Sequence, residues 1–153
     1  MEQVKLSKLR VLDLLQLVNN MKPADLPKFE TVRQVSKIAD KLEESIKTFM
    51  DERNDVASEA RKSIEKDKAA LDELVAKNDK KNEKAIKALE DKMNKDLEPF
   101  NEKLRKQEEK ALEEIELEFD KVQLDALKDI VKEGMDKFNS IAIYNSLCDS
   151  LGL

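Results

Sequence analysis

Apolar residues recur at alternating spacings of three and four over most of this chain. One series begins at Phe29 and a second runs from Ile86 to Val122. The first series comprises Phe29, Val32, Val35, Ala39, Leu42, Ile46 and Phe49, then Arg53, Val56, Ala60 and Ile64, and later Leu71 and Leu74. A spacing that averages 3.5 residues forms one apolar stripe along a helix, and a stripe sustained over several heptads predicts a coiled coil.

The segment that separates the two series, residues 77–82, has no apolar member. Asn78 is suitable as the end of one helix and Asn82 as the N-cap of the next. If the two series fold back on each other about this turn, the numbers of the paired residues add to roughly 160. Arg53 then lies opposite Gln107, whose amide carbonyl can accept a hydrogen bond from a buried Arg. We therefore predict an antiparallel coiled-coil hairpin over residues 28–122, with a turn near 77–82.

The scarcity of glycine excludes most other fold classes. The 153 residues include two Gly, whereas sandwiches, barrels, phosphate loops and dinucleotide folds need several left-handed backbone positions. Charged residues of both signs alternate and make up 41% of the chain, which is typical of long helices. The sequence predicts an all-α fold, or a mostly α fold with one short two-stranded pairing.

The N-terminal residues predict an extended piece followed by a helix. Val4 and Leu6 alternate with polar residues, and Ser7 then precedes apolar residues at helical spacing. Ser7 is suitable as the N-cap of a helix that ends near Asn19 and Asn20. Residues 22–27 contain two prolines and predict a connector to the first long helix.

The segment after Glu114 fits two interpretations. Ile115, Leu117 and Phe119 alternate with acidic residues, which is a strand pattern, and such a strand could pair with the segment from Val4 to Leu6. Ile115 and Phe119 also continue the helical series towards Val122. The sequence leaves strand and helix open for residues 115–120.

Two amphipathic helices are predicted for residues 123–153, the first ending at Gly134 and the second following Ser140. With the N-terminal helix they should form a small apolar head at the base of the hairpin. We therefore predict a single elongated domain over residues 1–153. Its parts are the N-terminal helix and connector (1–27), the hairpin (28–122) and the C-terminal helices (123–153).

The strongest charge feature is an acidic run near the end of the second series. It consists of Glu108, Glu109, Glu113, Glu114, Glu116, Glu118 and Asp120. Such a run is either a solvated face or a docking surface for a basic protein partner. Neither the overall charge of -5 nor any basic cluster supports nucleic-acid binding, so no nucleic-acid partner is expected.

Catalytic chemistry has little support in the composition. The chain has no histidine, which excludes Ser-His and Cys-His nucleophile pairs and the usual zinc and di-iron sites. No spacing of acidic residues resembles a calcium loop. The single Cys148, flanked by Leu147, is expected to be a buried hydrophobe in a reducing compartment. We expect no enzyme activity, no cofactor and no metal.

The order of these features resembles a family of short, uncharacterised phage and prophage helical proteins, a domain of unknown function encoded among late or structural phage genes. The resemblance rests on Lys5-Leu6, Leu26-Pro27, Phe49, Arg53, the segment from Glu113 to Phe119, Val122, Leu124 and Leu127. It covers most of the chain, although the hairpin is longer here. The resemblance implies a phage origin and a non-enzymatic role.

Together these features predict a non-enzymatic protein–protein interaction protein, virion-associated or an assembly factor. The alternative is a phage-encoded inhibitor of a host defence complex that acts through the acidic run. The partner would be a phage structural protein or a host factor, and a homo-oligomer stays open. No window approaches the roughly 18 apolar residues of a membrane span, and residues 1–5 lack an export signal, so we expect the host cytoplasm or the virion.

Overall fold

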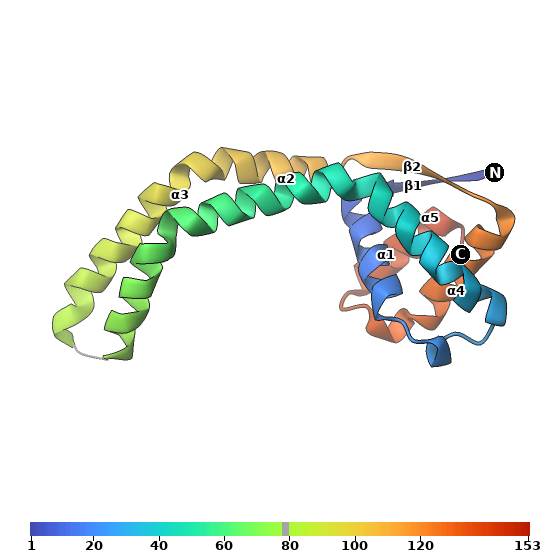
Figure 1. Cartoon of the computed structure of the whole chain (residues 1–153), viewed down its shortest axis with the longest axis horizontal. Coiled ribbons are helices and arrows are strands. Elements are labelled where there is room, and N and C mark those ends of the chain that lie inside the picture. The colour runs from blue at the N-terminus through green and yellow to red at the C-terminus, as the bar shows by residue number, and fades with distance from the viewer. Residues whose placement is uncertain (78–79) are drawn as a thin grey trace. The chain divides into compact units, whose positions relative to one another are not determined.

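The computed structural model describes every residue except 78 and 79, and it divides into two compact units (Figure 1). The head unit comprises Met1–Phe49 and Lys110–Leu153, and the hairpin unit comprises Met50–Glu109. The described strands and helices are β1 (Glu2–Ser7), α1 (Lys8–Asn20), α2 (Phe29–Ala76), α3 (Glu83–Ala111), β2 (Glu114–Phe119), α4 (Lys121–Glu133) and α5 (Ile141–Leu151). Short 3-10 turns lie at Pro23–Asp25, Lys80–Asn82 and Met135–Lys137. The predicted mostly α fold with one short β pairing is confirmed.

The hairpin unit contains α3 as far as Glu109 and the last part of α2, and the two helices lie side by side (Figure 1). Ion pairs cross between the helices, among them one from Lys92 to Asp67 at 3.1 Å and one from Lys103 to Glu59 at 3.5 Å. The residue numbers of these pairs add to 159 and 162, as the antiparallel register from the apolar pattern requires. The structure confirms the hairpin, while the predicted helix end at Asn78 lies outside the described residues.

The predicted pairing of Arg53 with Gln107 is wrong. The Gln107 Oε1 atom is buried and has no hydrogen-bond partner among the described residues, whereas the Arg53 side chain is exposed. A long Arg side chain can lie along the helix surface and keep its charged group in water, which costs less free energy than burying it. The hairpin therefore contains one unsatisfied amide oxygen where a polar layer was expected.

We expect Gln107→Leu to raise the free energy of unfolding by about 1 kcal/mol, because it removes a buried acceptor that lacks a donor. Urea denaturation followed by helical circular dichroism measures the change. Asn101→Leu, at an exposed position of the same helix, serves as the control and should change the stability little. Equal effects of the two substitutions would show that the side-chain amide of Gln107 has a hydrogen-bond partner in solution.

The head unit contains the two-stranded antiparallel sheet. Val4 pairs with Leu117 and Leu6 with Ile115, so the strand interpretation of residues 115–120 and its pairing with the N-terminal segment are confirmed. The returning helix of the hairpin ends at Ala111, and the helical series does not continue to Val122. Strict alternation of apolar and acidic residues explains this outcome, because only a strand places all three apolar side chains on one face.

Two helices of the head unit, α1 and α4, begin at side-chain caps. Ser7 Oγ accepts from the Arg10 backbone N–H at 3.2 Å, which confirms the predicted N-cap of α1. Asp120 caps α4 by accepting from the Gln123 backbone N–H at 2.7 Å. The helix α4 ends at Gly134, where a Cβ atom would lie 2.7 Å from Leu17 Cδ1, so the close packing of α1 against this end requires glycine.

The buried face of the first part of α2 differs from the predicted stripe. Thr31 and Ile38 are buried, whereas Phe29 is exposed and Val35 and Ala39 are half-buried. This part of α2 packs within the head unit: the Thr31 hydroxyl donates to Asp129 in α4 at 3.0 Å. The predicted stripe assumed that α3 faces the whole length of α2, but here the neighbours are α4 and the sheet.

The head unit contains all of the described residues that are fully buried. Its core consists of Val4, Leu6, Val11, Leu14, Leu15, Leu17, Val18, Leu26, Thr31, Ile38, Leu42, Ile46, Phe49, Ala111, Leu117, Phe119, Leu124, Ala126, Leu127, Ile130, Val131, Leu147 and Leu151. The helix α1, the first part of α2 and the two strands thus enclose an apolar interior together with α4 and α5. The half-buried seam of the hairpin unit is a much thinner core.

Candidate interaction surface

The acidic residues of β2 lie on one face of the sheet. Glu114, Glu116 and Glu118 are exposed, whereas Leu117 and Phe119, which alternate with them, are buried. Successive side chains of a strand point to opposite faces, so the alternating sequence brings the three carboxylates together. We call Glu114, Glu116 and Glu118 the acidic sheet face.

The strand β1 places polar and basic side chains beside these carboxylates. The Lys5 ammonium lies 3.5 Å from a Glu116 carboxylate oxygen, and Gln3 Nε2 donates to Glu118 Oε1 at 3.4 Å. Both members of the Lys5–Glu116 pair are exposed, so the pair stabilises the fold by at most about 1 kcal/mol and a partner can compete for it. The charge of the acidic sheet face is therefore partly balanced on its β1 side.

Two further lysines bind the segment around β2. Lys8 Nζ lies 2.9 Å from Glu113 Oε2, and Lys41 of α2 donates to the Glu118 carbonyl oxygen. The Lys41 ammonium also lies 5.0 Å from the centroid of the Phe119 ring. The sequence interpretation treated the run as acidic only and missed these lysines. The predicted pairing of the two strands was the signal that could have placed Lys5 opposite Glu116.

The remaining residues of the predicted run do not join the acidic sheet face. Asp120 caps α4 and so has a structural role. Glu108 and Glu109 belong to α3 in the hairpin unit, where Glu109 Oε1 lies 2.6 Å from the Arg105 guanidinium. The predicted surface of seven residues thus contains three carboxylates on one strand face, one ion-paired carboxylate at Glu113, one helix cap and two residues of the other unit.

Arg105 has a second acidic neighbour on α3. It donates to Glu102, and this hydrogen bond lowers the pKa of the Glu102 carboxyl and raises that of the Arg105 guanidinium. Glu102, Arg105 and Glu109 follow the three- and four-residue spacings at which helix side chains meet. The group therefore supports α3 locally.

In the described part of the chain, no group of three or more acidic or Cys side chains could hold a metal ion. Cys148 is half-buried rather than fully buried. The hydrogen bond with Cys148 raises the pKa of the Tyr144 hydroxyl.

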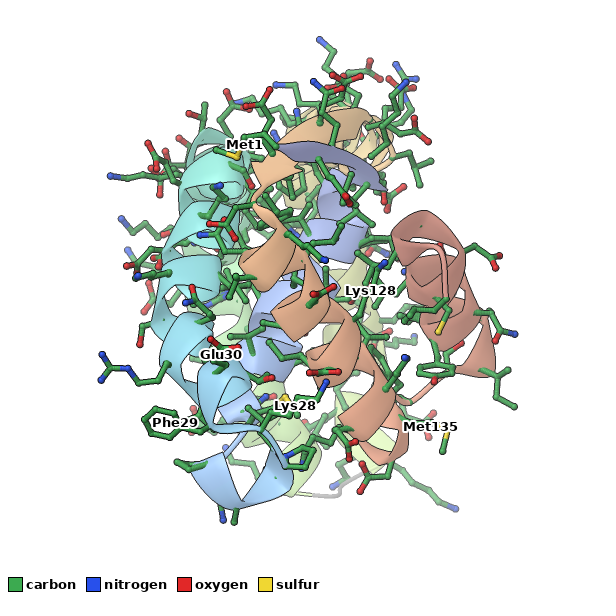
Figure 2. All side chains as sticks on the ribbon, turned by 90° about the vertical axis from the view of Figure 1, so that its right-hand side faces the viewer. Met1, Lys28, Phe29, Glu30, Lys128 and Met135 are labelled. Carbon is green, nitrogen blue, oxygen red and sulfur yellow. The ribbon has the colours of Figure 1, made fainter. Side chains whose placement is uncertain are left out.

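Several apolar side chains of the head unit are exposed. Phe29 at the start of α2 and Met135 after α4 both extend away from the ribbon (Figure 2), and Phe29 is 78% exposed. Beside Phe29, the Lys28 ammonium lies 3.2 Å from an Asp129 carboxylate oxygen. The sequence placed Phe29 in the hairpin stripe and so missed it as a surface residue.

Among the helices in the described ranges, none is both long enough and apolar enough to cross a membrane. No protein-family model, curated protein or solved structure matches this chain.

Proposed function

We propose that this chain is a non-enzymatic protein–protein interaction protein of phage origin that acts in the virion or in its assembly. The observation that carries the proposal is the thin core of the hairpin unit. None of its described residues is fully buried, although the unit comprises 60 residues, Met50–Glu109. A pair of helices that buries so little apolar surface gains much of its stability from a further surface that covers it.

Apolar side chains of the hairpin unit are available for such a contact. Leu104 is 40% exposed and Val75 is 56% exposed. Both lie on helices, which present a fixed row of side chains to a partner. The absence of histidine and the resemblance to helical phage proteins support a binding role rather than a catalytic one.

The proposal is tested in cells infected by the phage that encodes the protein. A tagged full-length chain is recovered under native conditions, bound proteins are identified by mass spectrometry, and sedimented particles are probed for the chain. We expect enrichment of capsid or tail proteins over a tag-only control. Failure to recover a phage protein, together with absence from the particles, would contradict the proposal.

A second candidate function is inhibition of a host defence complex. The three carboxylates of the acidic sheet face favour it, because they share one exposed face and could enter a basic groove. In this case the recovered partner would be a host complex, and expression of the chain alone would change host immunity.

A matched pair of variants separates the two candidates. The variant Glu114→Gln, Glu116→Gln, Glu118→Gln removes three charges from the acidic sheet face, and Asp40→Asn, Glu43→Gln, Asp51→Asn removes three exposed charges from α2. An inhibitor that uses the sheet should lose its host partner only with the first variant. Equal retention by both variants would exclude the acidic sheet face as the binding surface.

A further inference from the structure

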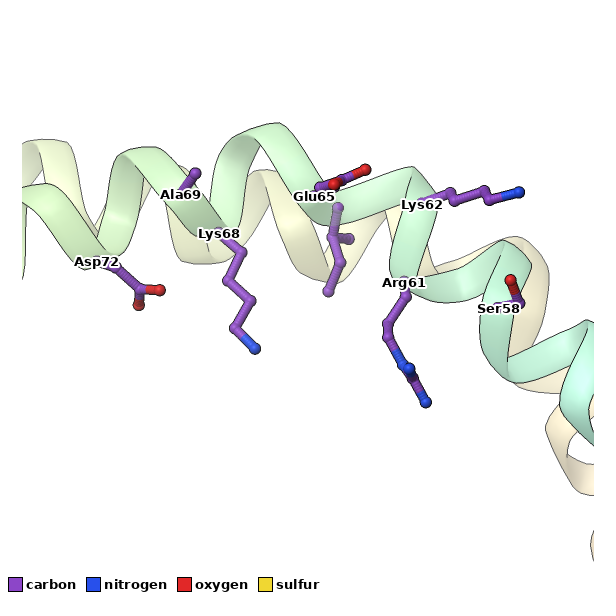
Figure 3. Close-up of a pocket in the computed structure, with 8 residues that line it drawn as sticks. Ser58, Arg61, Lys62, Glu65, Lys68, Ala69 and Asp72 are labelled. Atoms are coloured by element: carbon purple, nitrogen blue, oxygen red, sulfur yellow. The ribbon is translucent and has the colours of Figure 1, made fainter.

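A groove of about 480 Å³ runs along α2 within the hairpin unit (Figure 3). Its walls come from α2 alone: Ser58, Arg61, Lys62, Ile64, Glu65, Lys68, Ala69 and Asp72. Figure 3 shows Arg61, Lys68 and Asp72 extending to the same side of the helix. The groove is thus a surface between rows of side chains on one helix, which is the shape that receives another helix.

The groove follows a second heptad stripe of α2. Ser58, Arg61, Glu65, Lys68, Asp72 and Val75 are separated by three, four, three, four and three residues. The stripe that faces α3, which includes Ala60, Ile64, Asp67, Leu71 and Leu74, lies roughly 100° away around the helix. A helix seated along the second stripe would therefore leave the contact between α2 and α3 intact.

The charged groups of the second stripe are available for a partner. Arg61 and Glu65 are four residues apart, as are Lys68 and Asp72, so each pair could form an ion pair within the helix. None of these four side chains makes a hydrogen bond or ion pair with another described residue. These charges can therefore pair with charges of another molecule.

We propose that the groove binds the same segment of a second copy of this chain, with the two α2 helices antiparallel. Pairing the stripe with itself about its centre places Arg61 opposite Asp72 of the second copy, and Glu65 opposite Lys68. Each pair occurs twice because the interface has twofold symmetry. Ser58 then faces Val75, whose exposed side chain becomes partly covered.

The charges select both the partner and its direction. A parallel pairing in register would place Arg61 beside Arg61 and Lys68 beside Lys68, and like charges opposite each other repel. The antiparallel pairing instead produces four attractive contacts from one helix face. This self-complementarity specifies a second copy. The contact goes beyond the proposed binding of a phage protein and does not depend on it.

The experiment measures dimerisation of the full-length chain by sedimentation equilibrium at low salt. We expect a reversible dimer whose dissociation constant rises with added salt. Arg61→Glu places two acidic residues against the two copies of Asp72 and should raise the dissociation constant about tenfold. Adding Asp72→Arg to this variant should restore the wild-type value.

The rescue can arise only between chains. Arg61 and Asp72 lie eleven positions apart, about 16 Å along one helix, which their side chains cannot span. Lys66→Glu is the matched control, since it reverses an exposed charge of α2 outside the groove and should leave dimerisation unchanged. Circular dichroism checks that all variants keep their helix content.

Three results would overturn the proposal. If the chain remains monomeric up to several hundred micromolar, the groove does not bind a second copy, and a helix of another protein becomes the alternative occupant. A dimer that Lys66→Glu weakens as much as Arg61→Glu uses a different face. A dimer that Asp72→Arg does not restore is not paired in this register.

Discussion

Replacing Phe119 by Ala is expected to lower the free energy of unfolding of the head unit by about 3–5 kcal/mol. Phe119 ends β2 with its side chain completely buried, and its ring also contacts the Lys41 ammonium. Removing the ring loses its burial and leaves a cavity between the sheet and the helices. Urea denaturation followed by the fluorescence of Tyr144, the single tyrosine of the chain, reports on the head unit.

Leu112→Ala is the control for this substitution. Leu112 lies seven residues before Phe119, also in the head unit, and is 70% exposed. Its loss should change the free energy of unfolding by less than about 0.5 kcal/mol. Comparable effects of the two substitutions would mean that β2 does not cover the head core in solution.

The hairpin could be predicted from sequence because its two helices contact each other through apolar side chains that recur at a regular spacing along each helix. The apolar pattern predicted paired residue numbers that add to roughly 160, and the ion pair between Asp67 and Lys92 agrees with that register. Its polar layer could not be predicted in the same way. Whether Arg53 enters the interface or stays in water depends on two free energies that differ little: that of hydrating its guanidinium and that of hydrogen-bonding it inside the interface. The spacing of residues in the sequence does not reveal which is more favourable.

The sequence left residues 115–120 open between strand and helix, because the sequence of one segment does not show whether another strand lies beside it. Ile115 and Phe119 fit a helix as well as a strand until Val4 and Leu6 provide a neighbouring strand. The pairing joins residues more than a hundred positions apart. The choice between strand and helix was thus made by tertiary contact.

The acidic run shows the same limit at the candidate site. Glu118 and Asp120 are two positions apart in the sequence but have different roles, because one lies on a strand face and the other caps a helix. The alternation placed Glu116, Glu118 and Asp120 on one face, whereas in the structure Glu114 joins Glu116 and Glu118 there and Asp120 caps the next helix. The lysines that partly balance them come from β1, α1 and α2, so the net charge of the run overstated the charge of the surface.

We expect Ile38→Ala to lower the free energy of unfolding by about 3 kcal/mol and Val35→Ala to lower it by less than about 1 kcal/mol. The two residues distinguish the predicted stripe of α2 from the observed one. Ile38 is completely buried in the head unit, whereas Val35, which the heptad pattern placed in the interface, is half-buried. Denaturation with urea, again followed by Tyr144 fluorescence, measures both variants.

The comparison tests which neighbours the first part of α2 has in solution. Both substitutions leave Ala in a helix, so differences in backbone propensity are small and the contrast reports side-chain burial. A larger loss for Val35→Ala than for Ile38→Ala would mean that α2 presents the 3.5-residue stripe over its whole length. The head unit would then have to pack around Val35 and Ala39, and the hydrogen bond between Thr31 and Asp129 would not form.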